Sequence, residues 1–277
     1  MTEKKKHLSI SQLDLLSKCG YAWYLRYVMG IIAPPGIALI IGSGVDAPIS
    51  ADMMAKALDG SLLPEETIKD LASDKADELW ETVELQPDEI KEGKRKLKGE
   101  TKDMTVNLSL LHHREFGPEI TPKMYMSDKG MVPAVQRWFR LELEGYDYDL
   151  VGVMDQQEVG RIRDTKTIGK SPAKDAADRS MQLTLYSLAA EVIDGEQATE
   201  VCLDFLVKNQ TPKAVTQKST RTAEDHLALL NRVEAATKVI DAGAFVPARP
   251  DDWWCSPQWC GYYHCKYVGR SRLVQIT

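Results

Sequence analysis

The sequence lacks several features that would place it in other classes of protein. No apolar run approaches the length of a membrane-spanning helix, because Pro34, Pro35 and several glycines interrupt the longest one, residues 30–45. The first twelve residues contain no apolar core of the kind found in signal peptides. The formal net charge is −6, which argues against a protein that coats nucleic acid through its overall charge. We therefore expect a cytoplasmic protein without a membrane partner.

Cysteine is also scarce, with five among 277 residues, and disulfides are not expected in a cytoplasmic chain. Four of the five lie towards the two ends of the sequence: Cys19, Cys255, Cys260 and Cys265. Such a set of thiolates can hold zinc or an iron–sulphur cluster, and the ligands alone do not distinguish the two. His264 is an alternative zinc ligand, and four unrelated reduced thiols are the other interpretation. A centre joining Cys19 to the C-terminal segment would close most of the chain into one loop and act as a structural clasp.

Residues 149–167 carry the most specific pattern in the chain. Two runs with strand-like composition, Asp149–Met154 and Val159–Ile162, flank turn residues Gln156–Glu158, which predicts a β-hairpin. The alternating stretch Ala134–Leu143 predicts a neighbouring strand. A mixed α/β fold follows, because helical patterns surround these strands.

The predicted hairpin brings together two acids and an amine. Asp155 follows the first strand, Asp164 the second, and Lys166 comes two residues later. Because side chains alternate across a strand, Asp164 and Lys166 project to one face and Thr165 to the other. This is the minimal arrangement that holds a hard divalent cation and places an amine beside a bound water or phosphate. Isolated patterns of this kind are nevertheless common at strand ends on protein surfaces.

Two predicted helices supply further polar side chains. A Gly-Ser-Gly turn is expected to open a helix over Val45–Leu58, with Asp46 in its first turn, where the helix dipole favours a carboxylate. A second helix, Ala176–Ile193, carries Gln182 and Tyr186 on one face, because they are four residues apart.

The remaining periodicity predicts one domain with a helical insertion at about residues 60–120. The other expected elements are a helix from about Ser11 with a break near Cys19, helices at Glu65–Thr82, Asp88–Leu111 and Ala223–Ala242, and a buried strand at Val201–Val207.

Taken together, these motifs resemble the PD-(D/E)XK nuclease superfamily, specifically its RecB-like branch, which includes CRISPR-associated iron–sulphur exonucleases and bacteriophage exonucleases. The opening SISQLDLLSKCGYAWYLRYVMG is similar to the cysteine-bearing first helix of that branch. GSGVD matches the Gly-x-x-x-His motif with Asp46 in the histidine position, and GVMD and DTK supply Asp155, Asp164 and Lys166. QLTLY, residues 182–186, matches the Gln-x-x-x-Tyr motif. The three C-terminal cysteines match the cluster-bearing members in position, with wider spacing.

The resemblance implies a restriction-endonuclease-like core with a mixed central sheet flanked by helices. It also implies a metal-dependent DNA exonuclease that uses Mg²⁺ or Mn²⁺, with a 4Fe-4S cluster on the four terminal cysteines and structural Zn²⁺ as the alternative. The implied metal ligands are Asp46, Asp155, Asp164 and the main-chain carbonyl of Thr165. An aspartate in place of histidine shifts the preference of the site towards harder cations.

The resemblance also implies roles for the remaining residues. Lys166 would orient the attacking water or stabilise the transition state, and Gln182 and Tyr186 would position the lysine or the DNA backbone. Basic side chains near the hairpin are candidates for phosphate contacts: Arg161, Arg163, Lys170 and Lys174. Partners would be DNA ends, a single-strand annealing or recombination protein, and further copies of the chain. The alternatives are a non-catalytic DNA-binding or adaptor protein on the same fold and, more weakly, a zinc-stabilised interaction module.

Overall fold

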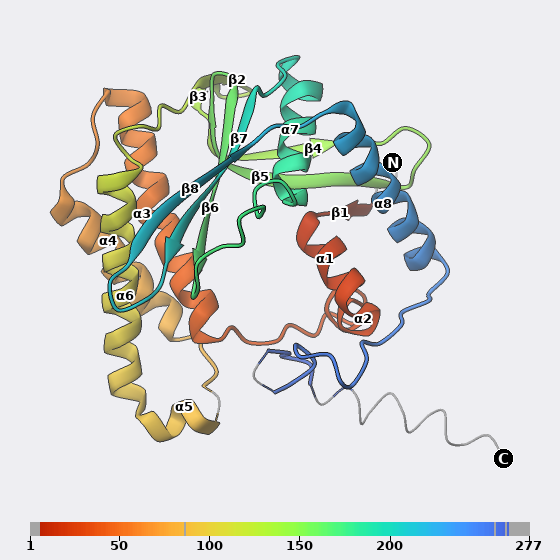
Figure 1. Ribbon diagram of the computed structural model, residues 1–277, viewed down its shortest axis with the longest axis horizontal. Helices are drawn as coiled ribbons and strands as arrows, with labels where there is room; N and C mark the ends of the chain where they lie inside the picture. Colours follow the sequence, from red (N-terminus) through yellow and green to blue (C-terminus); the bar gives the residue numbers. More distant parts are fainter. Residues whose placement is uncertain (1–5, 86, 258, 264, 266–277) are drawn as a thin grey trace. The chain divides into compact units, whose positions relative to one another are not determined.

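The computed structural model describes residues 6–85, 87–257, 259–263 and 265 (Figure 1). The described chain forms two compact units. Unit 1 comprises Met1–His7 and Pro35–Leu229, and unit 2 comprises Leu8–Pro34 and Leu230–Thr277. Both the hairpin residues and the two polar helices of the sequence pattern lie in unit 1, whereas all four terminal cysteines lie in unit 2.

A mixed sheet of six strands forms the centre of unit 1, in the order β1-β5-β6-β7-β8, with β4 also paired to β5. β6 and β7 are parallel, and the β4–β5, β5–β6 and β7–β8 pairs are antiparallel. A separate antiparallel hairpin is formed by β2 and β3. The strands are β1 (Lys6–Leu8), β2 (Met124–Ser127), β3 (Gly130–Pro133), β4 (Val135–Leu141), β5 (Tyr148–Glu158), β6 (Arg161–Ile168), β7 (Glu200–Val207) and β8 (Lys213–Ser219).

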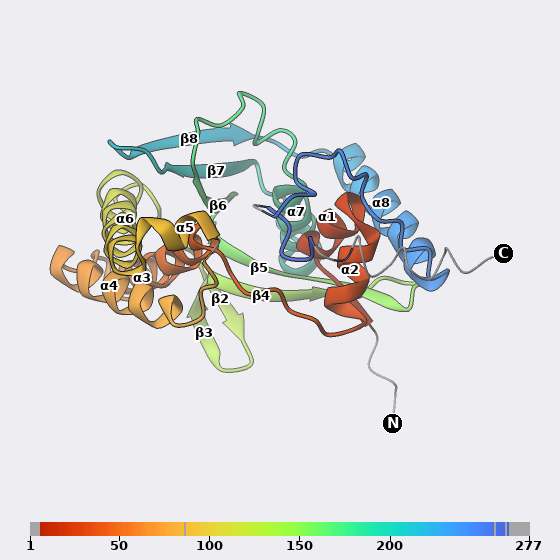
Figure 2. The ribbon, with the colours of Figure 1, turned by 90° about the horizontal axis from the view of Figure 1, so that it is seen from below.

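Helices flank this sheet, so the predicted mixed α/β architecture is confirmed. Helices α3, α4 and α6 group together and contact β4, β6, β7 and β8, whereas α7 packs on β4 to β7 (Figure 2). The helices are α1 (Ile10–Lys18), α2 (Gly20–Tyr27), α3 (Ile37–Asp59), α4 (Glu65–Trp80), α5 (Pro87–Glu92), α6 (Lys94–Glu115), α7 (Met181–Asp194) and α8 (Ala223–Asp241).

The core of unit 1 joins the α3–α6 pair to the sheet. Apolar side chains of α3 and α6 pack with Val135 of β4 and Leu206 of β7, and each of these residues is at least nine-tenths buried. Gly44 makes this packing possible, because a Cβ at that position would lie 2.9 Å from Thr105 Cγ2 of α6. Burial of several large aliphatic side chains, each contributing roughly 1.5–3 kcal/mol, therefore fixes α3 against the sheet.

Helix α3 corrects one prediction. The Gly-Ser-Gly stretch does not open a helix; it lies inside one that begins at Ile37, so Asp46 lies in the helix interior and not in the first turn. Buried residues recur in pairs at four-residue intervals along α3, and this apolar stripe overrides the low helix propensity of glycine. Among the described residues α3 is also the one helix long and apolar enough to span a membrane by length and composition, and 44% of its most apolar window is buried in the protein.

The hairpin is confirmed with different bounds. β5 extends through the residues predicted as the turn, and the reversal occurs at Val159–Gly160, where Gly160 has a φ of 71°. Gln156–Glu158 continue the strand because they pair with Arg161–Arg163 of β6. Asp155 and Asp164 therefore lie inside their strands, directly beyond the last paired residues of the hairpin.

The other elements agree with the sequence patterns to within a few residues. The break at Cys19, the strand β4 paired to β5, the buried β7 and helix α8 are confirmed. The helix expected over Asp88–Leu111 is two helices, because Gly93 adopts a φ of 100° between them. Helix α7 begins at Met181 and not at Ala176. The β2–β3 hairpin and β8 were not predicted.

Unit 2 is built around aromatic residues of α2. Trp23 stacks on Phe245 with ring centroids 5.4 Å apart, and Tyr24 lies 5.2 Å from the same ring. Gly20 permits this contact, because a Cβ there would lie 2.8 Å from the main-chain nitrogen of Val246. The segment after α8 is thereby fixed against α2, which is where Cys19 lies.

Candidate active site

The two hairpin aspartates and the lysine converge as the sequence predicted. The main-chain N–H of Thr165 donates a hydrogen bond to Asp155 Oδ2 at 2.9 Å, which ties β5 to β6 beyond the paired part of the hairpin. Lys166 Nζ lies 2.9 Å from Asp164 Oδ2 and 3.1 Å from Oδ1. Asp164 is completely buried, whereas the Lys166 side chain retains 41% exposure. The lysine is therefore the accessible member of the group.

The fold holds the carboxylates of this site in surroundings that disfavour their ionised form. Burial and the charge of Asp155 raise the pKa of Asp164 to about 7, although Lys166 partly offsets them. Desolvation and the charge of Asp155 likewise raise the pKa of Asp46, on the exposed side of α3, to about 6. Burial also raises the pKa of Asp155. Burial acts to lower the pKa of Lys166, but Asp164 outweighs it and the net direction is upward. Asp46, inside helix α3, is thus close enough to Asp155 and Lys166 for their charges to affect its pKa.

Helix α7 contributes the two polar side chains that the sequence singled out. Gln182 Nε2 donates a hydrogen bond to the Tyr186 hydroxyl at 2.5 Å. Burial raises the pKa of Tyr186, and the charges of Asp164 and Asp155 act in the same direction. Tyr186 also packs edge-on against Phe139 of β4, with ring centroids 6.0 Å apart. The tyrosine is therefore fixed on α7, close enough for the charges of both aspartates to raise its pKa.

The donor atoms fit a hard divalent cation in their chemistry. All the donors are oxygens, and the buried Asp164 Oδ2 has the Lys166 ammonium as its ion-pair partner at 2.9 Å. Three carboxylates with raised pKa values would each be stabilised in the ionised form by a bound cation. Nevertheless, the part of the chain that the structure describes contains no group of three or more His, Cys, Asp or Glu side chains already arranged around one metal position. The site thus offers oxygen ligands that are not yet arranged around one metal position, and Lys166 pairs with one of them, Asp164.

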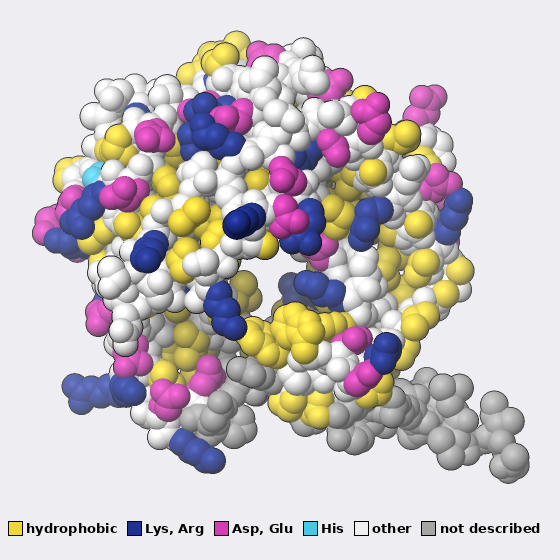
Figure 3. All heavy atoms as spheres, in the orientation of Figure 1, with side chains coloured by type: hydrophobic (Ala, Val, Ile, Leu, Met, Phe, Trp, Pro, Cys, Tyr) yellow, Lys and Arg dark blue, Asp and Glu magenta, His cyan; other side chains and the backbone are white. Residues whose placement is uncertain are grey.

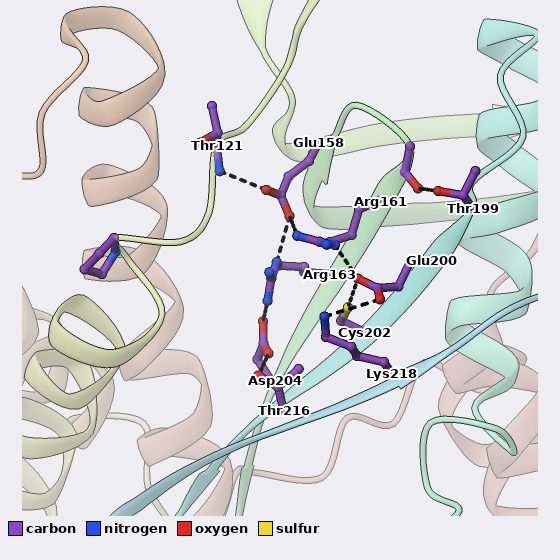
Figure 4. A network of polar contacts seen from close by, with 12 residues as sticks. Thr121, Glu158, Arg161, Arg163, Thr199, Glu200, Cys202, Asp204, Thr216 and Lys218 are labelled. Carbon is purple, nitrogen blue, oxygen red and sulfur yellow. Dashed lines mark hydrogen bonds and ion pairs between the residues drawn. The ribbon is translucent and has the colours of Figure 1, made fainter.

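The four basic candidates for DNA contact have different surroundings. Arg163 is buried and pairs with Glu158 at 2.7 Å and Asp204 at 2.9 Å, a network that also ties in Thr121 and Thr216 (Figure 4). This burial removes Arg163 from the residues that can reach a phosphate. Arg161 pairs with Glu200 at the edge of the same network (Figure 4).

Lys170 and Lys174 are exposed in the loop after β6. Over unit 1, the Lys and Arg side chains visible in Figure 3 are interspersed with acidic ones and form no continuous basic strip on that face. Any phosphate contacts on that face therefore depend on a few individual lysines and arginines.

The cysteines of unit 2 are partly brought together. Cys19 is buried, and its Sγ accepts hydrogen bonds from the main-chain N–H groups of Ala22 and Ala248, both at 3.3 Å. Burial raises the pKa of Cys260, a backbone N–H opposes this, and Cys255 and Cys19 raise the pKa further. Cys265 is half-buried, and His264 lies outside the described residues. Cys19 and Cys255 are therefore close enough to Cys260 to affect its pKa. The described residues nevertheless contain no group of three side chains arranged to hold a metal.

One residue of this site was not predicted. Burial raises the pKa of Asp155, and the side chain of Gln136, on β4, acts in the opposite direction. No sequence pattern distinguishes Gln136, because it occupies an ordinary polar position in an alternating strand. Cys202, by contrast, is the buried strand residue that its apolar surroundings predicted, and burial raises its pKa to about 12.

Comparisons with known proteins agree with this geometry. The family model for the PD-(D/E)XK nuclease superfamily matches residues 7–267. A crystal structure of a protein from Eubacterium rectale, provisionally named an exonuclease, is similar in fold, with a TM-score of 0.53 and 17% sequence identity over 89% of this chain and 85% of that one. Comparison with curated proteins gives no match. The resemblance inferred from the motifs is confirmed at the level of the superfamily. The chain belongs to the PD-(D/E)XK nuclease superfamily.

Proposed function

We propose that this nuclease is a divalent-metal-dependent exodeoxyribonuclease of the RecB-like branch. The observation that carries the proposal is the convergence of Asp155, Asp164 and Lys166 beyond the paired part of the hairpin, with Asp46 coupled to them electrostatically. DNA is the substrate class that a nuclease family implies, and members of this superfamily typically use Mg²⁺ or Mn²⁺.

Each residue has a proposed part in phosphodiester hydrolysis. Asp46, Asp155, Asp164 and the main-chain carbonyl of Thr165 would hold Mg²⁺ or Mn²⁺. A cation bound there would lower the pKa of water and neutralise charge on the phosphate. Lys166, whose side chain is 41% exposed and whose ammonium pairs with Asp164, would stabilise the charge that develops on the scissile phosphate.

The two residues of α7, Gln182 and Tyr186, are proposed to position other groups and to take no part in making or breaking bonds. Gln182 holds the Tyr186 hydroxyl, and the pair is proposed to position Lys166 or the DNA backbone. Lys170, Lys174 and Arg161 are proposed to contact the DNA backbone, since backbone contacts position nucleic acid without reading its sequence.

We further propose a 4Fe-4S cluster held by Cys19, Cys255, Cys260 and Cys265, with structural Zn²⁺ as the alternative. Two main-chain N–H groups donate hydrogen bonds to Cys19 Sγ, which supports a ligand role for this sulphur, because such second contacts orient metal ligands. Iron and zinc analysis of anaerobically purified protein, together with its visible absorption spectrum, separates a cluster from zinc and from free thiols.

The proposed setting is DNA processing or phage-type recombination in the cytoplasm. Partners would be DNA ends, a single-strand annealing or recombination protein, and further copies of the chain. The two units are proposed to act as one nuclease domain, with the segment around residues 60–120 as a helical insertion.

The second candidate function is a non-catalytic DNA-binding or adaptor protein on the same fold. It is favoured by the pairing of Lys166 with Asp164 and by the lack of a ready three-ligand group among the described residues. A zinc-stabilised interaction module is a weaker alternative.

The discriminating experiment is digestion of DNA labelled at the 5′ or the 3′ end, single- or double-stranded, with Mg²⁺, Mn²⁺ or chelator. We expect progressive shortening of linear DNA only when a divalent cation is present, with covalently closed circular DNA left intact. Binding without metal-dependent degradation would support the adaptor function instead.

A further inference from the structure

The backbone of Gln136 is exceptional within the described part of the chain. Its φ of 48° makes it the one non-glycine residue there with a positive φ. Gln136 lies inside strand β4, where an extended conformation is the norm, and glycine is the residue that adopts a positive φ without steric cost. A non-glycine residue persists in such a conformation when the surrounding structure holds it there, and such residues concentrate at functional sites.

The position of Gln136 on the sheet places it at the proposed metal site. Val135 pairs with Gln156 and Arg137 with Met154, so Gln136 lies across from Asp155 on the neighbouring strand. Asp155 Oδ2 accepts the main-chain N–H of Thr165 at 2.9 Å, and the side chain of Gln136 acts to lower the pKa of Asp155. Asp155 is therefore held from β6 and faces Gln136 across the β4–β5 pair.

The packing of β4 changes helix partners at the same point. Val135 belongs to the core formed with α3 and α6, whereas Phe139 packs against Tyr186 of α7. In a regular strand these two side chains would lie on one face, since they are four residues apart. Gln136, the residue with the positive φ, lies between them, and irregular residues in strands can redirect side chains beside active sites.

We infer that Gln136 is a positioning residue, which uses its left-handed backbone to direct an amide donor at Asp155 and fix that carboxylate for cation binding. The inference rests on the proposed function, because it treats Asp155 as a ligand. A purely structural role predicts a different sequence preference, since glycine would adopt the same positive φ with less strain and no amide.

The test uses full-length Gln136→Gly, in which the backbone conformation is retained without strain and the amide is lost. Mn²⁺ affinity without DNA is measured by electron paramagnetic resonance, and DNA cleavage is measured separately as kcat and KM. We expect a melting temperature equal to or above that of the wild type, a tenfold or greater rise in the Mn²⁺ dissociation constant, and a lower kcat with unchanged KM for DNA. The matched control is Gln197→Gly in an exposed loop of unit 1, which should leave the Mn²⁺ affinity unchanged.

The outcomes separate this inference from the proposed function. Wild-type Mn²⁺ affinity and kcat in Gln136→Gly would overturn the positioning role while leaving the nuclease assignment intact. Failure of the wild type itself to bind Mn²⁺ would instead overturn the proposed metal site. If Gln136→Gly melts below the wild type, Gln136→Asn decides, because asparagine tolerates a positive φ and keeps the amide. Affinity closer to wild type in Gln136→Asn than in Gln136→Gly supports the inference, and equal loss in both opposes it.

Discussion

The carboxylate site of unit 1 and the cysteine group of unit 2 differ in how much of each centre the fold assembles on its own. The carboxylates sit on adjacent strands, where register and burial hold them together although their charges repel. The cysteines lie at a helix break and in the segment after α8. The first centre therefore holds like charges together without a cation, whereas the second, if it holds a metal as proposed, would gain its full geometry on metal binding.

The largest effect expected concerns catalysis. Lys166→Ala should lower the rate of metal-dependent DNA cleavage by about 10²- to 10³-fold, because it removes the charge that stabilises the transition state. The measurement is single-turnover digestion of end-labelled DNA at saturating Mg²⁺, with circular dichroism to check folding. Lys170→Ala, an exposed lysine four residues away, is the control and should change the rate less than tenfold. Full activity in Lys166→Ala would refute the role assigned to this lysine.

The next effect tests the cysteine group. If unit 2 holds a metal or cluster, Cys260→Ala should lower the free energy of unfolding by roughly 3 kcal/mol, the size expected of a cross-link that closes a long loop. Cleavage by the folded fraction at low temperature should change little. The comparison is thermal melting before and after chelation, which should erase the difference between variant and wild type. An unchanged melting temperature in Cys260→Ala would rule out a structural clasp.

A smaller effect follows from the raised pKa of Asp164. Below about pH 4 the folded and unfolded states both keep this carboxyl protonated; between pH 4 and 7 only the unfolded state ionises. The free energy of unfolding of the metal-free protein should therefore fall as the pH rises through this window, by on the order of 1–3 kcal/mol. Asp164→Asn should flatten the slope and raise the stability at pH 7. Chemical denaturation at several pH values measures this, with exposed Asp70→Asn as the charge-matched control.

The smallest effect concerns the support of Asp46. Gly44→Ala would place a Cβ 2.9 Å from Thr105 Cγ2 and push α3 away from α6, so we expect a loss of about 1 kcal/mol of stability. Gly99→Ala in α6 is the control, because a Cβ there meets nothing within 4 Å and helix propensity should raise the stability by up to about 1 kcal/mol. Equal melting temperatures for the two variants would show that close packing at Gly44 does not hold α3.

The strand and helix patterns were sufficient for the local parts of the site. Alternation placed Asp164 and Lys166 on one face, and four-residue spacing joined Gln182 to Tyr186, because both rules depend only on backbone period. The exact turn was not predictable, since Gln156–Glu158 are as compatible with a strand as with a turn and only pairing with β6 decides between them.

What the sequence determined by itself was the superfamily, the mixed α/β class and the identity of the acids and lysine, since these follow from motif chemistry and side-chain periodicity. The tertiary structure alone decided three features of the site. Packing on α6 put Asp46 inside a long helix, and ion pairing with Glu158 and Asp204 buried Arg163. Pairing of β4 with β5 placed Gln136, which has a positive φ, across from Asp155. Each depends on contacts between residues distant in the chain, whose energies no local pattern records.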